Sequence, residues 1–321
     1  MTASGPTGRG GGPAPAECSG VLVVGKVRGM TSHDVVNLVR RRLGVRRVGH
    51  AGTLDPEAVG VLPILVGEAT KLMAYLAEQD KEYRATLRLG LRTDTHDLTG
   101  RLLSEQPVPP LGVAEVERAA AAFVGRIRQR PPMYSAVHHG GRRLYELARE
   151  GREVDRQPRE VTVHAIVVEE VAPPRVRLRI VCGKGTYVRV LAADLGDALG
   201  PGAVVEALVR TRVGPFELDA AVPVPELQSL DAAAVRARLR PPEAALAGWP
   251  TVRLGPRDAG AFRQGQAVAL GAAVASSGTR VAVHEIGGPL IGIGELTGSG
   301  EVVKPVRVLH AGHPGSRVLP A

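Results

Sequence analysis

The sequence has little cysteine, few aromatic residues and no long apolar segment. Only Cys18 and Cys182 are cysteines among its 321 residues, and aromatic residues make up 3%. The two cysteines form no Cys-x-x-Cys pair, which excludes a disulfide framework and a zinc-finger spacing. The histidines show no ligand spacing with acidic residues, so we expect no metal. Without an 18-residue apolar run or an apolar N-terminal segment, we expect a cytoplasmic protein with no membrane partner.

What the sequence does have is an excess of positive charge. Lysine and arginine number 41 against 32 acidic residues, a formal net charge of +9. Such an excess favours a polyanionic partner such as RNA, DNA or an anionic membrane surface. The chain is also rich in alanine, glycine, arginine and proline, as a GC-rich genome alone would produce. Charge by itself leaves both explanations open.

The composition and the pattern of apolar residues change along the chain. Residues 1–17 are mostly glycine, proline, alanine and threonine, and they predict a disordered tail. Residues 18–246 mix helical and alternating apolar patterns, which predicts an α+β domain. From Trp249 onward, short apolar runs alternate with glycine-rich turns, which predicts a small all-β barrel over residues 247–313.

Several elements of the α+β part can be placed from local signals. Gly20–Val24 has the composition of a buried strand, and residues 83–89 and 175–181 alternate like half-buried strands. Capping hydroxyls at Thr31 predict a helix that ends at Gly44. Further helices are predicted at 113–124 and 190–199.

The run Gly49–Pro63 contains three glycines and two prolines, which predicts a shaped loop in place of a continuous helix or strand. Asp55 stands directly before Pro56, a position that restricts its backbone and its side-chain direction. His50 and two arginines precede it in a basic neighbourhood. An aspartate in a loop is usually a turn former. The loop residues alone therefore leave a turn and a reactive carboxylate as alternatives.

Residues 129–159 are strongly basic, with arginines interleaved with Tyr134 and Tyr145. One interpretation is an arginine-rich helix whose charges are simply solvated. Alternating cations and aromatic rings favour a nucleic-acid clamp instead.

Five segments of the sequence resemble motifs of the TruB family of tRNA pseudouridine synthases. They are Gly49–Pro63, Gly67–Leu72, Pro131–Ala136, Gly141–Glu146 and Gly183–Arg189. The resemblance extends over about residues 20–310. It implies a pseudouridine synthase catalytic domain at 18–246, with a mixed, mainly antiparallel sheet flanked by helices and an RNA-clamping thumb at 129–159. A PUA-like RNA-binding domain would follow at 247–313. One departure is Gly25-Lys26-Val27, where the family has Asp-Lys-Pro.

The family motifs imply roles for individual side chains. Asp55 would be the nucleophile, and Arg189 would pair with it. Tyr83 would border the uracil and assist removal of its C5 proton, although a tyrosine at a strand start is normally a packing residue. Tyr187 would line the pocket and Leu208 would wall it, although spacing alone places Leu208 in the core. The remaining expectations are His50 against the RNA, Asp97 at the border of the site, and RNA contacts from Lys26, Arg46, Arg47, Arg130, Arg142 and Arg143.

The implied reaction is the isomerisation of uridine to pseudouridine at position 55 in the TΨC loop of tRNA, on a flipped-out base. It exchanges no atoms or electrons with another molecule, so we expect no cofactor. We also expect a monomer without an obligatory protein partner. Two alternatives remain: a non-catalytic RNA-binding or RNA-chaperone protein, and a guide-RNA-dependent synthase of the same family. A lone carboxylate among cations disfavours the first, and the basic segment 129–159 disfavours the second.

Overall fold

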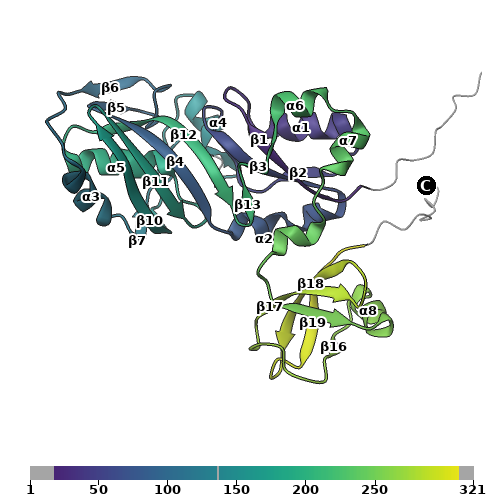
Figure 1. The fold of residues 1–321 in the computed structure, drawn as a ribbon. Coiled ribbons are helices and arrows are strands. Elements are labelled where there is room, and N and C mark those ends of the chain that lie inside the picture. The colour runs from purple at the N-terminus through teal and green to yellow at the C-terminus, as the bar shows by residue number, and fades with distance from the viewer. Residues whose placement is uncertain (1–17, 136, 311–321) are drawn as a thin grey trace, which may run out of the picture.

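The computed structural model describes residues 18–135 and 137–310. The predicted tail at 1–17 and residues 311–313 of the predicted C-terminal barrel lie outside this range. Two separate β-sheets organise the chain, a large one followed by a smaller C-terminal one (Figure 1). No helix in the described part is long and apolar enough to cross a membrane.

The large sheet has ten strands, and its main order is β14-β1-β3-β12-β4-β11-β10-β7, with β2 on β3 and β13 on β12. Most pairs are antiparallel, whereas β1–β14 and β3–β12 are parallel, which confirms the mixed, mainly antiparallel sheet. The strand β12 lies between β3 and β4, although it follows both in the chain. The strands are β1 (Gly20–Lys26), β2 (Val48–His50), β3 (Val59–Val66), β4 (Lys81–Leu89), β7 (Gly125–Gln129), β10 (Arg159–Ala172), β11 (Arg175–Cys182), β12 (Ala203–Val213), β13 (Phe216–Glu217) and β14 (Val222–Pro223).

Apolar side chains alternate between the two faces of this sheet. In β1, Leu22 and Val24 join one buried cluster, while Val21 and Val23 join another on the opposite face. The first cluster is covered by α1 (Ser32–Leu43), α3 (Val113–Ala121), α5 (Val188–Leu199), α6 (Val224–Ser229) and α7 (Ala232–Ala237). The second is covered by η1 (Gly67–Leu72), α2 (Met73–Glu78) and η2 (Pro242–Leu246). The sheet is therefore flanked by helices, as predicted.

Local signals placed α1 correctly, because its ends are capped as the sequence suggests. Thr31 and Asp34 form a capping box, and Gly44 closes the helix with φ of +67°. In contrast, α5 begins at Val188, two residues earlier than predicted, which puts Arg189 in its first turn.

The prediction of a continuous loop over Gly49–Pro63 is only partly right. Residues 51–58 are irregular, but His50 ends β2 and the run from Val59 onward belongs to β3. Gly60 allows β3 to start here and to lie against β12, because its φ of +110° suits glycine. A Cβ at this position would come within 2.2 Å of the Arg210 carbonyl oxygen. Glycine here therefore permits close packing between strands.

The C-terminal sheet has the order β15-β17-β18-β19-β16 and its own apolar core. No pairing closes β15 onto β16 within the described residues, so the sheet is curled into half a barrel. It also carries a helix, α8. The elements are β15 (Thr251–Leu254), α8 (Pro256–Arg263), β16 (Val268–Ala269), β17 (Arg280–Glu285), β18 (Leu290–Thr297) and β19 (Val302–Val308).

The C-terminal sheet packs against η1 and α2, which cover one face of the large sheet. Leu290 and Ile293 belong to the same buried cluster as Val21 and Val23 of β1. Nearby, the Tyr75 ring meets the Trp249 ring edge-on, with ring centroids 5.7 Å apart. A polar contact adds to this, as Lys71 Nζ donates to the Val308 carbonyl at 2.8 Å. Apolar and polar contacts together join the two sheets.

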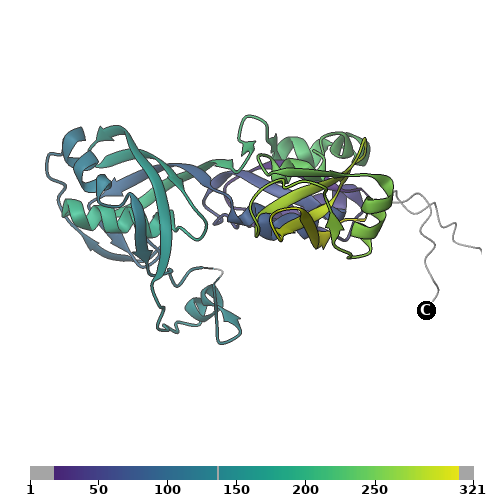
Figure 2. The same cartoon turned by 90° about the horizontal axis from the view of Figure 1, so that it is seen from below.

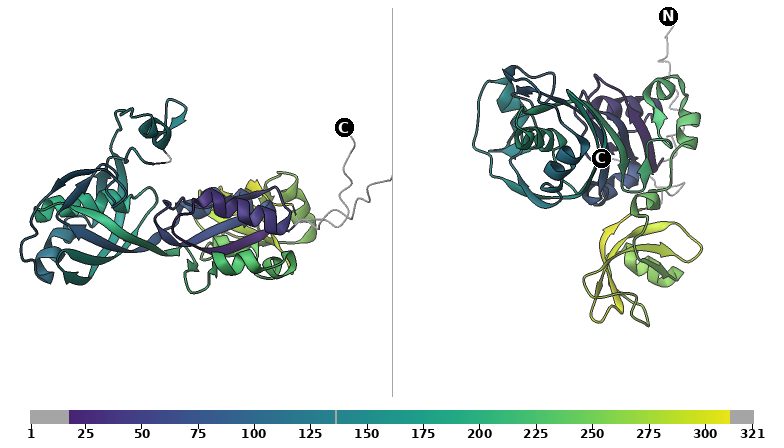
Figure 3. Two further views of the ribbon diagram at one scale, coloured as in Figure 1. Left: turned by 90° about the horizontal axis from the view of Figure 1, so that it is seen from above. Right: turned by 60° about the vertical axis from the view of Figure 1, so that its left-hand side comes forward.

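Two small hairpins lie outside both sheets. One, β5 (Leu91–Thr93) with β6 (Leu102–Glu105), lies beside β12. The other, β8 (His138–His139) with β9 (Arg142–Arg143), is followed by α4 (Leu144–Arg149). Together β8, β9 and α4 project from the large sheet as an arm (Figures 2 and 3). The arm falls within the predicted thumb.

Candidate active site

The loop that carries Asp55 is anchored to α1 and to β1. Ser32 Oγ accepts from Leu54 N at 2.9 Å and donates to Leu54 O at 3.2 Å. Lys26 Nζ donates to the Pro56 carbonyl at 3.1 Å. The residues on both sides of Asp55 are thus fixed, while its own side chain stays 41% exposed. A restrained but accessible carboxylate results.

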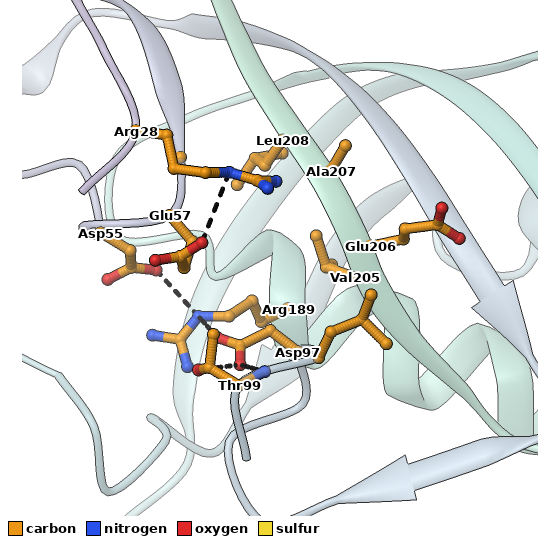
Figure 4. A pocket seen from close by; sticks show the side chains of 12 residues that line it. Arg28, Asp55, Glu57, Asp97, Thr99, Arg189, Val205, Glu206, Ala207 and Leu208 are labelled. Atoms are coloured by element: carbon orange, nitrogen blue, oxygen red, sulfur yellow. Dashed lines mark hydrogen bonds and ion pairs between the residues drawn. The ribbon is translucent and has the colours of Figure 1, made fainter.

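Arg189, in the first turn of α5, holds this carboxylate. Its Nε donates to Asp55 Oδ2 at 2.8 Å (Figure 4). Its terminal nitrogens donate to the backbone carbonyls of Thr95 at 2.7 Å and Tyr134 at 2.9 Å. Asp97 Oδ2 is 3.9 Å from Arg189 Nε, so Asp97 lies beside the Asp55–Arg189 pair. The Arg189 side chain is only 6% exposed, so the guanidinium has one fixed position.

Two adjoining cavities share the Asp55–Arg189 pair as lining. The larger, of about 250 Å³, is also lined by Tyr83, Tyr187 and Leu208. The smaller, of about 80 Å³, is lined by Asp97 and again by Leu208 (Figure 4). The structure therefore brings together six of the residues that the resemblance singles out. His50 ends β2 opposite Ile64 and is not part of either lining.

Both tyrosines in the larger cavity are neutral at physiological pH. Burial raises the pKa of Tyr83, which extends from β4 and is 9% exposed. Burial also raises the pKa of Tyr187. The backbone of Tyr187 is fixed by Gln129, whose Oε1 accepts from its N–H at 2.9 Å. These rings are rigid walls with a polar edge.

Sequence reasoning missed two cations in the larger cavity, Arg210 and Lys81. Arg210 is 1% exposed and donates to the carbonyls of Val61 at 2.8 Å and Gly52 at 3.0 Å. Lys81 is 6% exposed and lies on the same face of β4 as Tyr83. The alternation of β4 could have indicated Lys81, because it lies two residues before Tyr83.

The expected RNA contact from Lys26 is wrong. Lys26 is 1% exposed, and its ammonium donates to the carbonyls of Val27 at 3.0 Å, Met30 at 2.8 Å and Pro56 at 3.1 Å. Burial lowers its pKa to about 8. The ammonium supports the Asp55 loop from behind and is unavailable to a phosphate.

The other basic residues expected to meet RNA lie at the surface. Arg46 and Arg130 are exposed, and so is Arg47, which pairs with Glu68. Arg142 is exposed on the arm. The backbone of Arg143 lies in β9, but its side chain is outside what the structure describes. Contact of these residues with RNA remains a prediction.

Within residues 18–135 and 137–310, no three histidine, cysteine or acidic side chains lie together as metal ligands. The chemistry available at this site is that of the Asp55 carboxylate held by Arg189, the nearby Asp97 carboxylate, neutral phenols and buried cations.

Comparison with known proteins gives matches along most of the chain. Residues 40–188 match the family "TruB family pseudouridylate synthase (N terminal domain)". Residues 189–247 match "tRNA pseudouridylate synthase B C-terminal domain", and residues 250–309 match "Pseudouridine synthase II TruB, C-terminal". The tRNA pseudouridine synthase B of Moorella thermoacetica is 50% identical over 237 residues, which are 73% of this chain and 78% of that protein. That of Dechloromonas aromatica is 44% identical over 293 residues, 91% of this chain and 96% of that one.

The chain belongs to the TruB family of pseudouridine synthases. As a TruB family member it is an enzyme, an isomerase. Its fold is similar to that in the "Crystal Structure of a Cbf5-Nop10-Gar1 Complex", with a TM-score of 0.71 and 25% identity, over 92% of this chain and 85% of that one.

Proposed function

We propose that this TruB family enzyme converts uridine to pseudouridine at position 55 in the TΨC loop of tRNA, with Asp55 as the nucleophile. The observation that carries the proposal is the Asp55–Arg189 pair, at 2.8 Å, in the lining of a cavity walled by Tyr83, Tyr187 and Leu208. The relatives named tRNA pseudouridine synthase B support tRNA as the substrate.

The chemistry fits a carboxylate held in this way. Uracil must leave its sugar through N1, turn while still enclosed, and rejoin through C5. An aspartate is ionised at neutral pH and needs no separate base to become a nucleophile. Arg189 fixes the direction of the Asp55 oxygen, and orientation of this kind accounts for a large part of a catalysed rate.

A uridine inside a folded loop can reach Asp55 only after leaving its stack, which costs a few kcal/mol. Stacking on an aromatic ring returns about 1–3 kcal/mol per base. Tyr83 and Tyr187 supply such rings, and Leu208 closes the apolar wall. The arm and the exposed arginines around the site would hold the phosphate backbone while the base is extruded.

We assign Tyr83 to packing and hydrogen bonding of the base, and not to removal of the C5 proton. A phenol with a raised pKa is protonated at neutral pH, so it has no free charge with which to take a proton. This differs from the role that the family motif suggests.

The test is to incubate the purified enzyme with an unmodified tRNA transcript and to map pseudouridine along it. We expect conversion at position 55 and none in a transcript with cytidine there. Asp55→Asn should abolish conversion while tRNA affinity changes little. Asp94→Asn is the control, because Asp94 lies in the neighbouring turn and lines neither cavity.

The same assay separates the alternatives. It contains only one protein and one transcript, so conversion contradicts both a non-catalytic RNA-binding role and a need for guide RNA or a partner. Tight binding without conversion supports the non-catalytic role. Appreciable turnover by the Asp55→Asn enzyme contradicts the assigned nucleophile.

A further inference from the structure

The lining of the larger cavity contains more positive than negative side chains. Its charged lining residues are Asp55, Arg189, Lys81 and Arg210. Asp55 and Arg189 neutralise each other as an ion pair, which leaves two cations in the lining without a carboxylate partner there. Low exposure makes this costly, since buried cations are normally paired. A charge arrangement that opposes folding in this way is typical of functional sites.

The two cations lie side by side under the loop that precedes Asp55. A Cβ placed on Gly52 would be 3.4 Å from Arg210 Nη1 and 3.9 Å from Lys81 Cε. Arg210 on β12 stands directly opposite Tyr83 on β4, and both line the larger cavity. We call Lys81 and Arg210 the cationic floor of the cavity.

Lys81 retains a donor for a ligand. Its ammonium carries three N–H groups, and two donate to the carbonyls of Ala77 and Gln79, each at 2.5 Å. The third is available to the cavity that Lys81 lines. The nearest acids, Asp80 and Glu78, lie outside this lining and are engaged with His164 at 3.0 Å and Lys184 at 2.5 Å.

We propose that the cationic floor stabilises the uracil ring as an anion during the time in which it is detached from the ribose, with Lys81 as a further catalytic residue. This inference rests on the proposed function. In the simplest balanced route, an Asp55 oxygen bonds to C1′ as the C1′–N1 bond breaks, and its electron pair leaves on the ring. The ring turns, C5 displaces Asp55 from C1′, the C5 proton goes to water, and N1 takes a proton from water.

Negative charge appears on the ring when C1′–N1 breaks, and that charge is what fixed cations in a water-poor site can stabilise. Neutral uridine gains much less from the floor than the detached anion does. The interaction therefore acts on the rate of the step and only weakly on substrate binding. The charge is spread over N1, C5 and the two carbonyl oxygens, so more than one cation can share it.

The test compares Lys81→Met with Lys81→Arg in the full-length enzyme, acting on the tRNA transcript. Lys81→Met removes the charge while keeping an unbranched side chain. We expect its kcat at pH 7 to fall about 10²-fold, the size of effect seen when one stabilising donor is lost. KM should change by less than about twofold, because uniform binding is untouched. Lys71→Met is the matched control, since Lys71 is a partly buried lysine at the back of the large sheet.

The pH profile distinguishes this role from simple structural support. Burial, with a smaller effect of Arg210, lowers the pKa of Lys81 to about 8, while Asp80, Glu78 and the neighbouring Cys182 oppose this. The cation is therefore present below pH 8 and is lost as pH rises through 8, so wild-type kcat should fall there. Lys26 also has a pKa of about 8. The decisive result is that Lys81→Arg shifts the fall to higher pH.

Two results would overturn the inference: a Lys81→Met enzyme with near-wild-type kcat, or a Lys81→Arg enzyme whose kcat still falls at pH 8. Should Lys81→Met fail to fold by circular dichroism, the Lys81→Arg profile decides alone. If the wild-type enzyme forms no pseudouridine, the proposed function fails. If Asp55→Asn is inactive and Lys81→Met is not, only the cationic floor fails.

Discussion

Replacing Arg189 with methionine should weaken the fold and the catalysis by separable amounts. The guanidinium makes three short bonds, to Asp55 Oδ2 and to the carbonyls of Thr95 and Tyr134. A hydrogen bond from a charged donor is worth about 1.5–3 kcal/mol when its partner is left buried. The bond to Asp55 contributes less, about 0–1 kcal/mol, because that carboxylate is 41% exposed and solvent screens it. The two carbonyl bonds therefore dominate, and we expect the free energy of unfolding to fall by about 3 kcal/mol.

Catalysis should fall further than stability suggests. Without Arg189, nothing fixes the direction of the Asp55 carboxylate, and a misplacement of about 1 Å can cost 10²-fold in rate. We expect kcat to drop by at least that factor under conditions where the variant is still folded. Arg189→Lys should recover the charge but not the three-way bonding, because an ammonium is a point donor without the planar fork.

Urea denaturation followed by circular dichroism measures the first effect, and initial rates at saturating tRNA measure the second. Arg92→Met is the matched control. Arg92 also donates to one carboxylate and two carbonyls, those of Asp197, Pro201 and Gly200, but its carbonyl bonds are 3.3–3.4 Å and its side chain is 33% exposed. The Arg92→Met variant should lose about 1 kcal/mol or less of its free energy of unfolding and keep the wild-type kcat. Equal losses in the two variants, or an active Arg189→Met enzyme, would refute the reasoning.

Two further predictions concern strand packing and RNA affinity. Gly60→Ala places a methyl group 2.2 Å from the Arg210 carbonyl oxygen, at a φ of +110°. We expect the free energy of unfolding to fall by more than about 3 kcal/mol, as measured by thermal denaturation. A variant with unchanged stability would contradict the packing of β3 on β12. Gly44→Ala is its control, because φ is +67° but space is open, and it should lose only about 1 kcal/mol. The affinity for tRNA should fall steeply with added salt, given a net charge of +9 and exposed arginines around the site, as measured by filter binding. A flat salt response would remove the phosphate-clamp interpretation.

Local patterns in the sequence were enough to predict many of the elements. The alternation from Tyr83 to Leu89 is the strand β4, and the capping residues Thr31 and Gly44 bound α1. These signals are local because backbone hydrogen bonding and solvent exposure repeat with the period of each element. The α+β class and the small β domain followed from the same signals.

The site itself could not be derived from local signals. Asp55 and Arg189 are 134 residues apart, and only the family motifs linked them. Lys26 was misjudged because a lysine in a sequence does not show whether its ammonium will meet solvent or three backbone carbonyls. Arg210 was missed for a related reason, since its strand contains several polar residues. Only the placement of β12 between β3 and β4 buries it.

That placement of β12 also affects how the protein matures during synthesis. The strands β3 and β4 are synthesised early, with Asp55 and Tyr83 near their ends. These two strands do not pair with each other. The strand that joins them, Ala203–Val213, emerges from the ribosome more than a hundred residues later. Contacts between such distant segments form late, because a long stretch of chain must first be ordered. A nascent chain therefore carries Asp55 for most of its synthesis without the rest of the candidate site around it, and β12 can complete the large sheet only when nearly two thirds of the sequence has emerged.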